Sequence, residues 1–138
     1  MIAFAVKWTI KTGCNEKALD GLQLLAQSVA QEPGTLMYLA HTPDSIRFTC
    51  TQGDEHESLP TPSTQEVIFI EQCVDEDAFY QHVHGAAFQE FLREYGDLFL
   101  FNNRQPFVTI EFPKRQAGFI RPAASARCFM KGGEHANL

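Results

Sequence analysis

Two stretches decide the predicted fold of this 138-residue chain: Glu32-Pro-Gly-Thr-Leu-Met-Tyr38 and Val67-Ile-Phe-Ile-Glu-Gln-Cys-Val-Asp-Glu-Asp-Ala-Phe79. In the first, proline and glycine end a helix and an apolar strand follows at once. In the second, an apolar strand runs directly into an acidic segment, which is typical of the first turn of a helix. Their order predicts a topology in which chemistry can take place between a sheet and its helices.

The sequence before these stretches predicts a strand and a helix. Large apolar side chains alternate over residues 2–10 and would lie on one face of a strand: Ile2, Phe4, Val6, Trp8 and Ile10. Asn15 is then the expected N-cap of a helix. Its apolar positions recur at steps of three and four residues: Leu19, Leu22, Leu25, Ala26 and Val29. The second strand is expected over residues 35–42.

The sequence between and after the two stretches predicts the remaining elements. Residues 46–51 would form a short third strand and residues 52–65 a long polar loop. The strand over residues 66–74 is almost continuously apolar, so both of its faces should be covered. A helix capped by Asp75 follows, with Phe79 and Val83 on its buried face, and Gly85 divides it. Its apolar stripe continues with Phe88, Phe91, Leu92 and Tyr95, and a last strand is expected over residues 105–112.

This order of elements is the split βαβ pattern of a ferredoxin-like α+β fold with an antiparallel sheet. Residues 1–112 would form the domain. Residues 113–138 show no clear period and would be a C-terminal extension that wraps a partner subunit or is partly disordered.

Composition excludes several classes of function. The net charge of −6 and the pI of about 5.3 argue against a nucleic-acid-binding surface. No apolar run approaches a membrane span, and the N-terminal segment lacks a signal-like cleavage site, so we expect a cytoplasmic protein with no membrane contact. The four cysteines lack the spacing of a zinc site or a redox dithiol: Cys14, Cys50, Cys73 and Cys128. There is also no phosphate loop or dinucleotide fingerprint, so no cofactor and no metal are expected.

The two stretches, together with His82 ahead of Phe88 and Phe91, resemble the antibiotic biosynthesis monooxygenase domain over about residues 1–112. The resemblance implies a homodimer in which two ferredoxin-like sheets pack face to face as a dimeric α/β barrel. Each subunit then holds a pocket between its sheet and its helices. It also implies cofactor-free oxygenases of quinols or aromatic polyketides in secondary metabolism, with O2 as a possible co-substrate. Haem degradation, known in other relatives, is disfavoured because Cys73 replaces the tryptophan of that branch.

The candidate catalytic residues are His82 and His41. His82 lies three residues after Phe79 on the flank of the buried helix face, where an imidazole can act as a general base near neutral pH. His41 closes the second strand, at a sheet end where pockets often open. Either histidine could instead be structural. The candidate substrate-binding residues are Trp8, Tyr38, Phe79, His84, Phe88 and Arg47. Glu71 is a charge in a buried strand and would pair with Lys7, Arg47 or a residue of the second subunit.

The sequence leaves several functions open. The leading one is a cofactor-independent monooxygenase of a flat aromatic, polyketide-like or quinol substrate, deprotonated by His82 or His41. The same pocket and base could catalyse cyclisation, isomerisation or dehydration of a polyketide without consuming O2. A non-catalytic dimeric binding domain is the third possibility.

Overall fold

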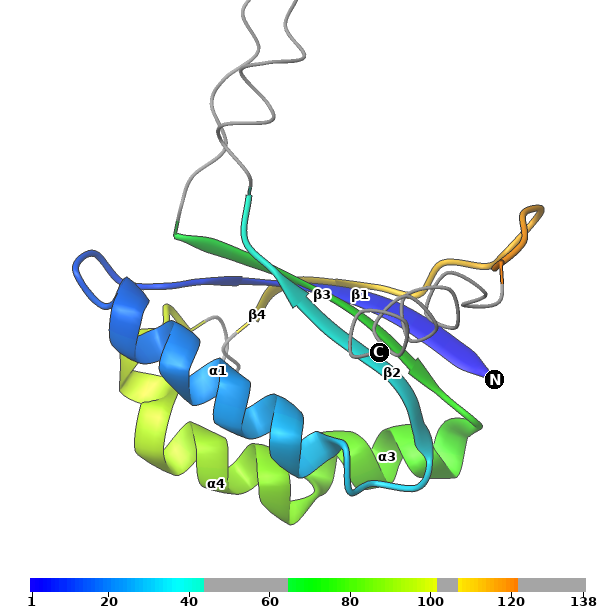
Figure 1. Cartoon of the computed structure of the whole chain (residues 1–138), viewed down its shortest axis with the longest axis horizontal. Coiled ribbons are helices and arrows are strands. Elements are labelled where there is room, and N and C mark those ends of the chain that lie inside the picture. Colours follow the sequence, from blue (N-terminus) through cyan, green and yellow to red (C-terminus); the bar gives the residue numbers. More distant parts are fainter. Residues whose placement is uncertain (44–64, 102–106, 122–138) are drawn as a thin grey trace, which may run out of the picture.

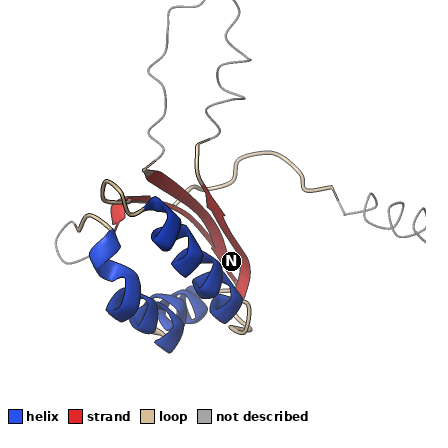
Figure 2. Ribbon diagram, turned by 60° about the vertical axis from the view of Figure 1, so that its left-hand side comes forward, coloured by secondary structure: helices blue, strands red, loops and turns tan. Residues whose placement is uncertain are grey.

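The computed structural model describes residues 1–43, 65–101 and 107–121, and for 107–109 only the path of the backbone. In these ranges a four-stranded antiparallel sheet, in the order β2-β3-β1-β4, carries its helices on one face (Figures 1 and 2). The strands are β1 (Ile2–Thr9), β2 (Thr35–His41), β3 (Glu66–Cys73) and β4 (Phe107–Glu111). The helices are α1 (Asn15–Val29), α3 (Glu76–His84) and α4 (Ala86–Tyr95), followed by a 3-10 turn at Gly96–Leu98. The ferredoxin-like α+β prediction is therefore confirmed.

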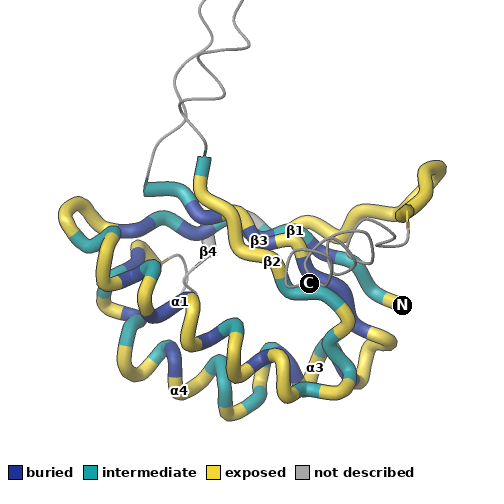
Figure 3. Tube along the Cα trace, in the orientation of Figure 1, coloured by how far each residue is buried: buried dark blue, intermediate teal, exposed yellow. Residues whose placement is uncertain are grey.

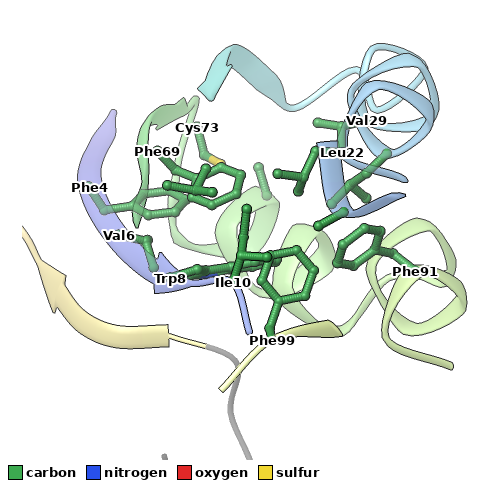
Figure 4. Packing of buried hydrophobic residues seen from close by; sticks show 14 residues of the cluster. Phe4, Val6, Trp8, Ile10, Leu22, Val29, Phe69, Cys73, Phe91 and Phe99 are labelled. Atoms are coloured by element: carbon green, nitrogen blue, oxygen red, sulfur yellow. The ribbon is translucent and has the colours of Figure 1, made fainter. Parts of the chain in front are cut away.

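The central strand β1 supplies much of the core. It pairs with β3 on one side and β4 on the other. Its alternate side chains Phe4, Val6 and Trp8 are buried beneath the helices, as the period of two predicts (Figure 4). Trp8 packs against Phe69, Phe91 and Phe99, with ring centroids 4.6, 5.7 and 5.2 Å away. Burial of these large rings provides the main hydrophobic stabilisation of the sheet–helix contact.

Strand β3 is covered on one face only in the single chain. Val67, Phe69 and Glu71 are buried under the helices, whereas Ile68 and Ile70 are 36% and 44% exposed on the opposite face. The prediction that both faces are covered is therefore wrong for the isolated subunit. All the described helices pack on one side of the antiparallel sheet, and this leaves the other side open (Figure 3).

The helix boundaries agree with the sequence in part. Asn15 is the first residue of α1 and not its N-cap, because the capping position falls on Cys14. Asp75 caps α3 as predicted, since its carboxylate accepts a hydrogen bond from the Ala78 amide at 2.8 Å. Gly85 is extended and separates α3 from α4, also as predicted.

The buried face of α3 differs from the prediction. Ala78 and His82 are its buried residues, whereas Phe79 is only half-buried. The reason is a close approach between α3 and the turn before β2. A Cβ atom on Gly34 would lie 2.5 Å from the Cβ of Ala78, so only a glycine lets the turn pack this closely. Because α3 is rotated relative to the prediction, His82 lies at the centre of its buried face and not on the flank of that face.

Some predicted segments lie outside the described residues, namely the short strand at 46–51, nearly all of the loop at 52–65 and residues 122–138 of the predicted C-terminal extension. Beyond β4, residues 113–121 are exposed and make no strand. None of the helices in the described ranges is long and apolar enough to cross a membrane.

Candidate active site

The imidazole of His82 lies between two carboxylates. Its Nδ1 is 2.7 Å from Oε2 of Glu32, and its Nε2 is 2.9 Å from Oε2 of Glu71. The side chains of His82 and Glu71 are almost fully buried, and that of Glu32 is 23% exposed. Apart from the contact with His82, Oε2 of Glu71 has no hydrogen-bond partner in the described part of the chain. The three side chains therefore form one buried polar cluster in an otherwise apolar interior.

Three elements that are far apart in the sequence supply this cluster. Glu32 comes from the turn after α1, and its Oε2 also accepts a hydrogen bond from the Thr35 hydroxyl at 2.8 Å. Glu71 lies on the inner face of β3 and His82 on the buried face of α3. The close packing of Gly34 against α3 brings the turn near enough for Glu32 to reach the imidazole.

The geometry places one ring nitrogen of His82 beside each carboxylate. With both carboxylates ionised the ring is an imidazolium, because a neutral imidazole has a single N–H to donate. Burial by itself would lower the pKa of His82, but the hydrogen bonds and charges of Glu71 and Glu32 together raise it above the usual value. Burial raises the pKa of Glu71 as well, only partly opposed by the charge and hydrogen bond of His82. The pKa values of Glu71 and His82 are thus both raised, and the cluster holds a proton between these two groups.

A cavity of about 350 Å³ opens beside this cluster, between the sheet and helices α3 and α4. Glu71 and His82 form the buried polar part of its wall, and His84 and Gln89 add polar side chains at exposed positions. The rest is largely aromatic and aliphatic. The lining residues are Phe4, Val6, Trp8, Glu71, Phe79, His82, Val83, His84, Phe88, Gln89, Leu92 and Ile110. A cavity of this size and character is suited to a flat apolar molecule with a few polar groups.

Four of the six residues predicted to bind substrate line this cavity: Trp8, Phe79, His84 and Phe88. Tyr38 lies outside its wall, with its ring 5.8 Å from that of His82 on the β2 side. Burial and the charges of Glu71 and Glu32 hold the pKa of the Tyr38 phenol well above its usual value, so this hydroxyl stays protonated. His84 is exposed at the mouth of the cavity and stacks on Tyr80.

The structure separates the two candidate histidines. His41 is opposite Ile68 in the β2–β3 register, and both point to the sheet face away from the helices. His82 is on the helix side, so the cavity receives only one of the two. Arg47 lies outside the described residues. The partner of Glu71 also differs from the prediction, because it is His82, while Lys7 lies 3.7 Å from Glu66.

Glu32 is the site residue that sequence reasoning missed. It directly precedes Pro33 and Gly34. Because these two residues strongly predict the end of a helix, the sequence suggests only that Glu32 belongs to that helix end. The sequence identifies Glu71 as a buried charge but does not identify its partner. The available signal was that a buried carboxylate needs a cation beside it. Phe4 and Val6, predicted on the apolar face of the first strand, also line the cavity, and so does Ile110, which the sequence did not single out.

Within the described ranges, no group of three or more side chains of the metal-binding types is placed to hold a metal ion. The polar cluster contains one imidazole already engaged by two carboxylates. What the site offers chemically is a buried carboxylate of raised pKa, an adjacent imidazole held by two carboxylates and a largely aromatic wall.

Comparisons with known proteins give one consistent result. The family model described as "Antibiotic biosynthesis monooxygenase" matches residues 1–94. The crystal structure of an antibiotic biosynthesis monooxygenase superposes with a TM-score of 0.62 at 17% identity, covering 85% of this chain and 100% of that one. PA3566 from Pseudomonas aeruginosa gives a TM-score of 0.59 at 22% identity, with 84% and 94% of the two chains covered. A conserved protein from Methanosarcina mazei Go1 gives 0.61 at 13% identity, with 83% and 92% covered. No curated protein sequence matches significantly.

Proposed function

The chain belongs to the antibiotic biosynthesis monooxygenase family, and on that premise we propose that it is a cofactor-independent monooxygenase of a phenolic aromatic, polyketide-like or quinol substrate. The cavity beside Glu71 and His82 would hold the substrate ring. Its volume of about 350 Å³ accommodates a system of two or three fused rings. The single observation that carries the proposal is the buried carboxylate of Glu71 at the wall of an aromatic cavity.

The proton acceptor in this proposal is Glu71. His82 was the sequence-based candidate, but both of its ring nitrogens face carboxylates, so it has no free lone pair to offer a substrate. Burial raises the pKa of Glu71, which makes this carboxylate a stronger base than an exposed one. The imidazolium of His82 would then stabilise the negative charge that develops on the substrate oxygen.

The proposed reaction consumes one O2 per turnover. Glu71 takes the phenolic proton, and the substrate anion passes one electron to O2, giving a substrate radical and superoxide. Their combination forms a C–O bond, and the resulting peroxide anion takes the proton back from Glu71 to give a hydroperoxide. Loss of water from that hydroperoxide leaves a quinone, so that phenol and O2 become quinone and water. Phe4, Phe79 and Phe88 would exclude bulk water from the charged intermediates.

We also propose that the protein works as a homodimer. The sheet face away from the helices exposes Leu39 at 46% and Ile70 at 44%, and these two residues are neighbours in the β2–β3 register. Ile68 lies two residues along the same face. A contiguous apolar patch of this kind typically marks an interface. A second copy that packs its own sheet on this face would cover it.

The decisive measurement is oxygen uptake with a naphthol as the substrate, together with the quinone formed. We expect one O2 consumed per quinone, and a loss of about 10²–10⁴-fold in kcat for Glu71→Gln, the range expected for removal of a general base. His41→Ala is the matched control and should keep its activity, because His41 is on the opposite face of the sheet.

Two other outcomes would overturn the proposal. Turnover of a polyketide-type substrate without O2 uptake would make the protein a cyclase, isomerase or dehydratase that uses the same base. Absence of both binding and turnover across phenols and quinols would indicate a non-catalytic binding domain.

A further inference from the structure

A second and larger cavity, of about 580 Å³, adjoins the first near the N-terminal end of β1. It lies between the first turns of α3 and the segment that follows β4. Its aromatic wall is formed by Phe79, Tyr80 and Phe112, and its cationic wall by Lys114 and Arg115. The proposed reaction uses none of these groups except Phe79.

Phe79 is common to the walls of both cavities. Its ring makes edge contacts with Phe4 on the inner side, at 5.1 Å between centroids, and with Phe112 on the outer side, at 5.6 Å. Phe79 is half-buried and Phe112 is 56% exposed, so both rings lie in the partition rather than deep in the core. A rotation of exposed or half-exposed rings is fast compared with enzymatic turnover. Phe79 and Phe112 therefore lie between the two cavities, and Phe79 is the residue that both walls share.

The outer cavity is cationic in a protein whose net charge is −6. Lys114 and Arg115 form no ion pair with any residue that the structure describes. Among the described residues of the lining, Glu76 is the one acidic residue, and it offsets part of their charge. Two unpaired cations beside aromatic surface form a suitable site for a carboxylate on an apolar stem.

We propose that the substrate is an aromatic acid long enough to occupy both cavities. Its ring would lie beside Glu71 in the inner cavity, its aliphatic stem would pass Phe79, and its carboxylate would be bound by Lys114 and Arg115. This inference rests on the proposed function for the placement of the ring. It adds the chemical class of the substrate tail and two residues that determine specificity without touching the reacting atoms.

Fluorescence of Trp8 allows a binding test that does not depend on turnover. Trp8 is the only tryptophan of the chain and lines the inner cavity. The probes are naphthoquinones that carry a propanoate, pentanoate or heptanoate chain, the methyl ester of each, and the parent naphthoquinone without a chain. In every probe a methyl group occupies each quinone-ring carbon that carries no chain, so the parent is the dimethyl naphthoquinone and addition to thiols such as Cys14 is blocked. Quenching of Trp8 reports occupancy by the ring in every case.

We expect at least one acid to bind about tenfold more tightly than its ester, as two partly exposed ion pairs would give. The Lys114→Ala/Arg115→Ala variant should remove that difference and leave ester binding unchanged. Lys11→Ala/Lys17→Ala is the matched control: it removes the same charge at exposed positions outside the cavity and should keep the difference.

The outcomes separate this inference from the function on which it rests. Equal affinity of acids and esters for the natural chain, or an equal loss in the two double variants, would overturn the anionic-tail proposal even if the parent naphthoquinone binds. Failure of every probe to quench Trp8 would overturn both, because the inner cavity would then not accept a ring.

Discussion

Removal of the His82 imidazole tests the charge arrangement at the cavity wall. In a His82→Ala variant the buried carboxylate of Glu71 loses the cation that lies 2.9 Å away. Breaking a buried ion pair by deleting one partner costs about 3–5 kcal/mol. The side chain of Glu71 is 6% exposed and that of Glu32 is 23% exposed, so Glu71 accounts for most of the cost. We therefore expect the lower end of the range, about 3 kcal/mol, at pH 7.

The cost should shrink in acid. The hydrogen bond and charge of His82 oppose the rise that burial causes in the pKa of Glu71. Without His82 that pKa rises further. A carboxyl group whose pKa is higher in the folded than in the unfolded state binds its proton preferentially in the folded state. The variant therefore loses stability as the pH rises from the unfolded value of about 4.3 through the higher folded value.

The unaltered protein behaves differently in this window. The pKa of His82 is raised by its two carboxylates, so its stabilisation is fully present below the unfolded value of about 6.5 and is lost as the pH rises through the higher folded value. We expect the deficit of His82→Ala to be about 3 kcal/mol at pH 7 and smaller at pH 5, where the buried Glu71 of the variant binds a proton and no longer leaves an unpaired charge.

Urea unfolding at pH 5, 6 and 7 measures this deficit. The control is Glu71→Gln/His82→Ala, which leaves no buried carboxylate on β3 and should be equally stable at pH 5 and pH 7. A His82→Ala deficit of the same size at both pH values would refute the reasoning, because it would show that His82 contributes packing and not charge.

Three further predictions concern the scaffold. Gly34→Ala should cost about 1–3 kcal/mol in urea unfolding because its Cβ meets that of Ala78, and the same change should cost less when it is made in an Ala78→Gly background; an equal cost in both backgrounds would contradict the clash. Asp75→Ala should cost about 1 kcal/mol through loss of the α3 cap, whereas Asp75→Asn should cost little; equal losses would exclude the capping explanation. Ile70→Glu should convert a dimer to a monomer in light scattering after gel filtration, whereas Leu24→Glu, on the outer side of α1, should not; a monomeric parent protein would contradict the proposed dimer.

The fold was largely accessible from the sequence because it depends on short-range patterns. The period of two over β1 identified the buried residues Phe4, Val6 and Trp8. The acidic segment after β3 located the start of α3, and Gly85 located its end. The N-cap of α1 was misplaced by one residue, which is ordinary uncertainty at a helix boundary.

The site was less accessible because it depends on how elements rotate and approach one another. Periodicity placed His82 60° away from a buried face centred on Phe79, but the helix turns so that Ala78 can contact Gly34. The spacing of residues along the sequence cannot predict this rotation of α3, because the rotation arises from contact with a turn more than 40 residues earlier. The separation of His41 from His82 likewise depends on the register of β2 against β3, which a sequence without its pairing partner leaves open.

The stretch Glu-Pro-Gly-Thr joins fold and chemistry more closely than its role as a helix stop suggests. Gly34 removes the side chain that would hold α3 away, and this lets Glu32 reach Nδ1 of His82. Thr35 then holds the same carboxylate oxygen from the start of β2. Because Glu32 fixes one ring nitrogen of His82, the other nitrogen and its proton face Glu71 at the cavity wall. The protonation of the proposed base is thus coupled to the turn that ends α1, so a change in that turn should alter activity even though none of its residues lines the cavity.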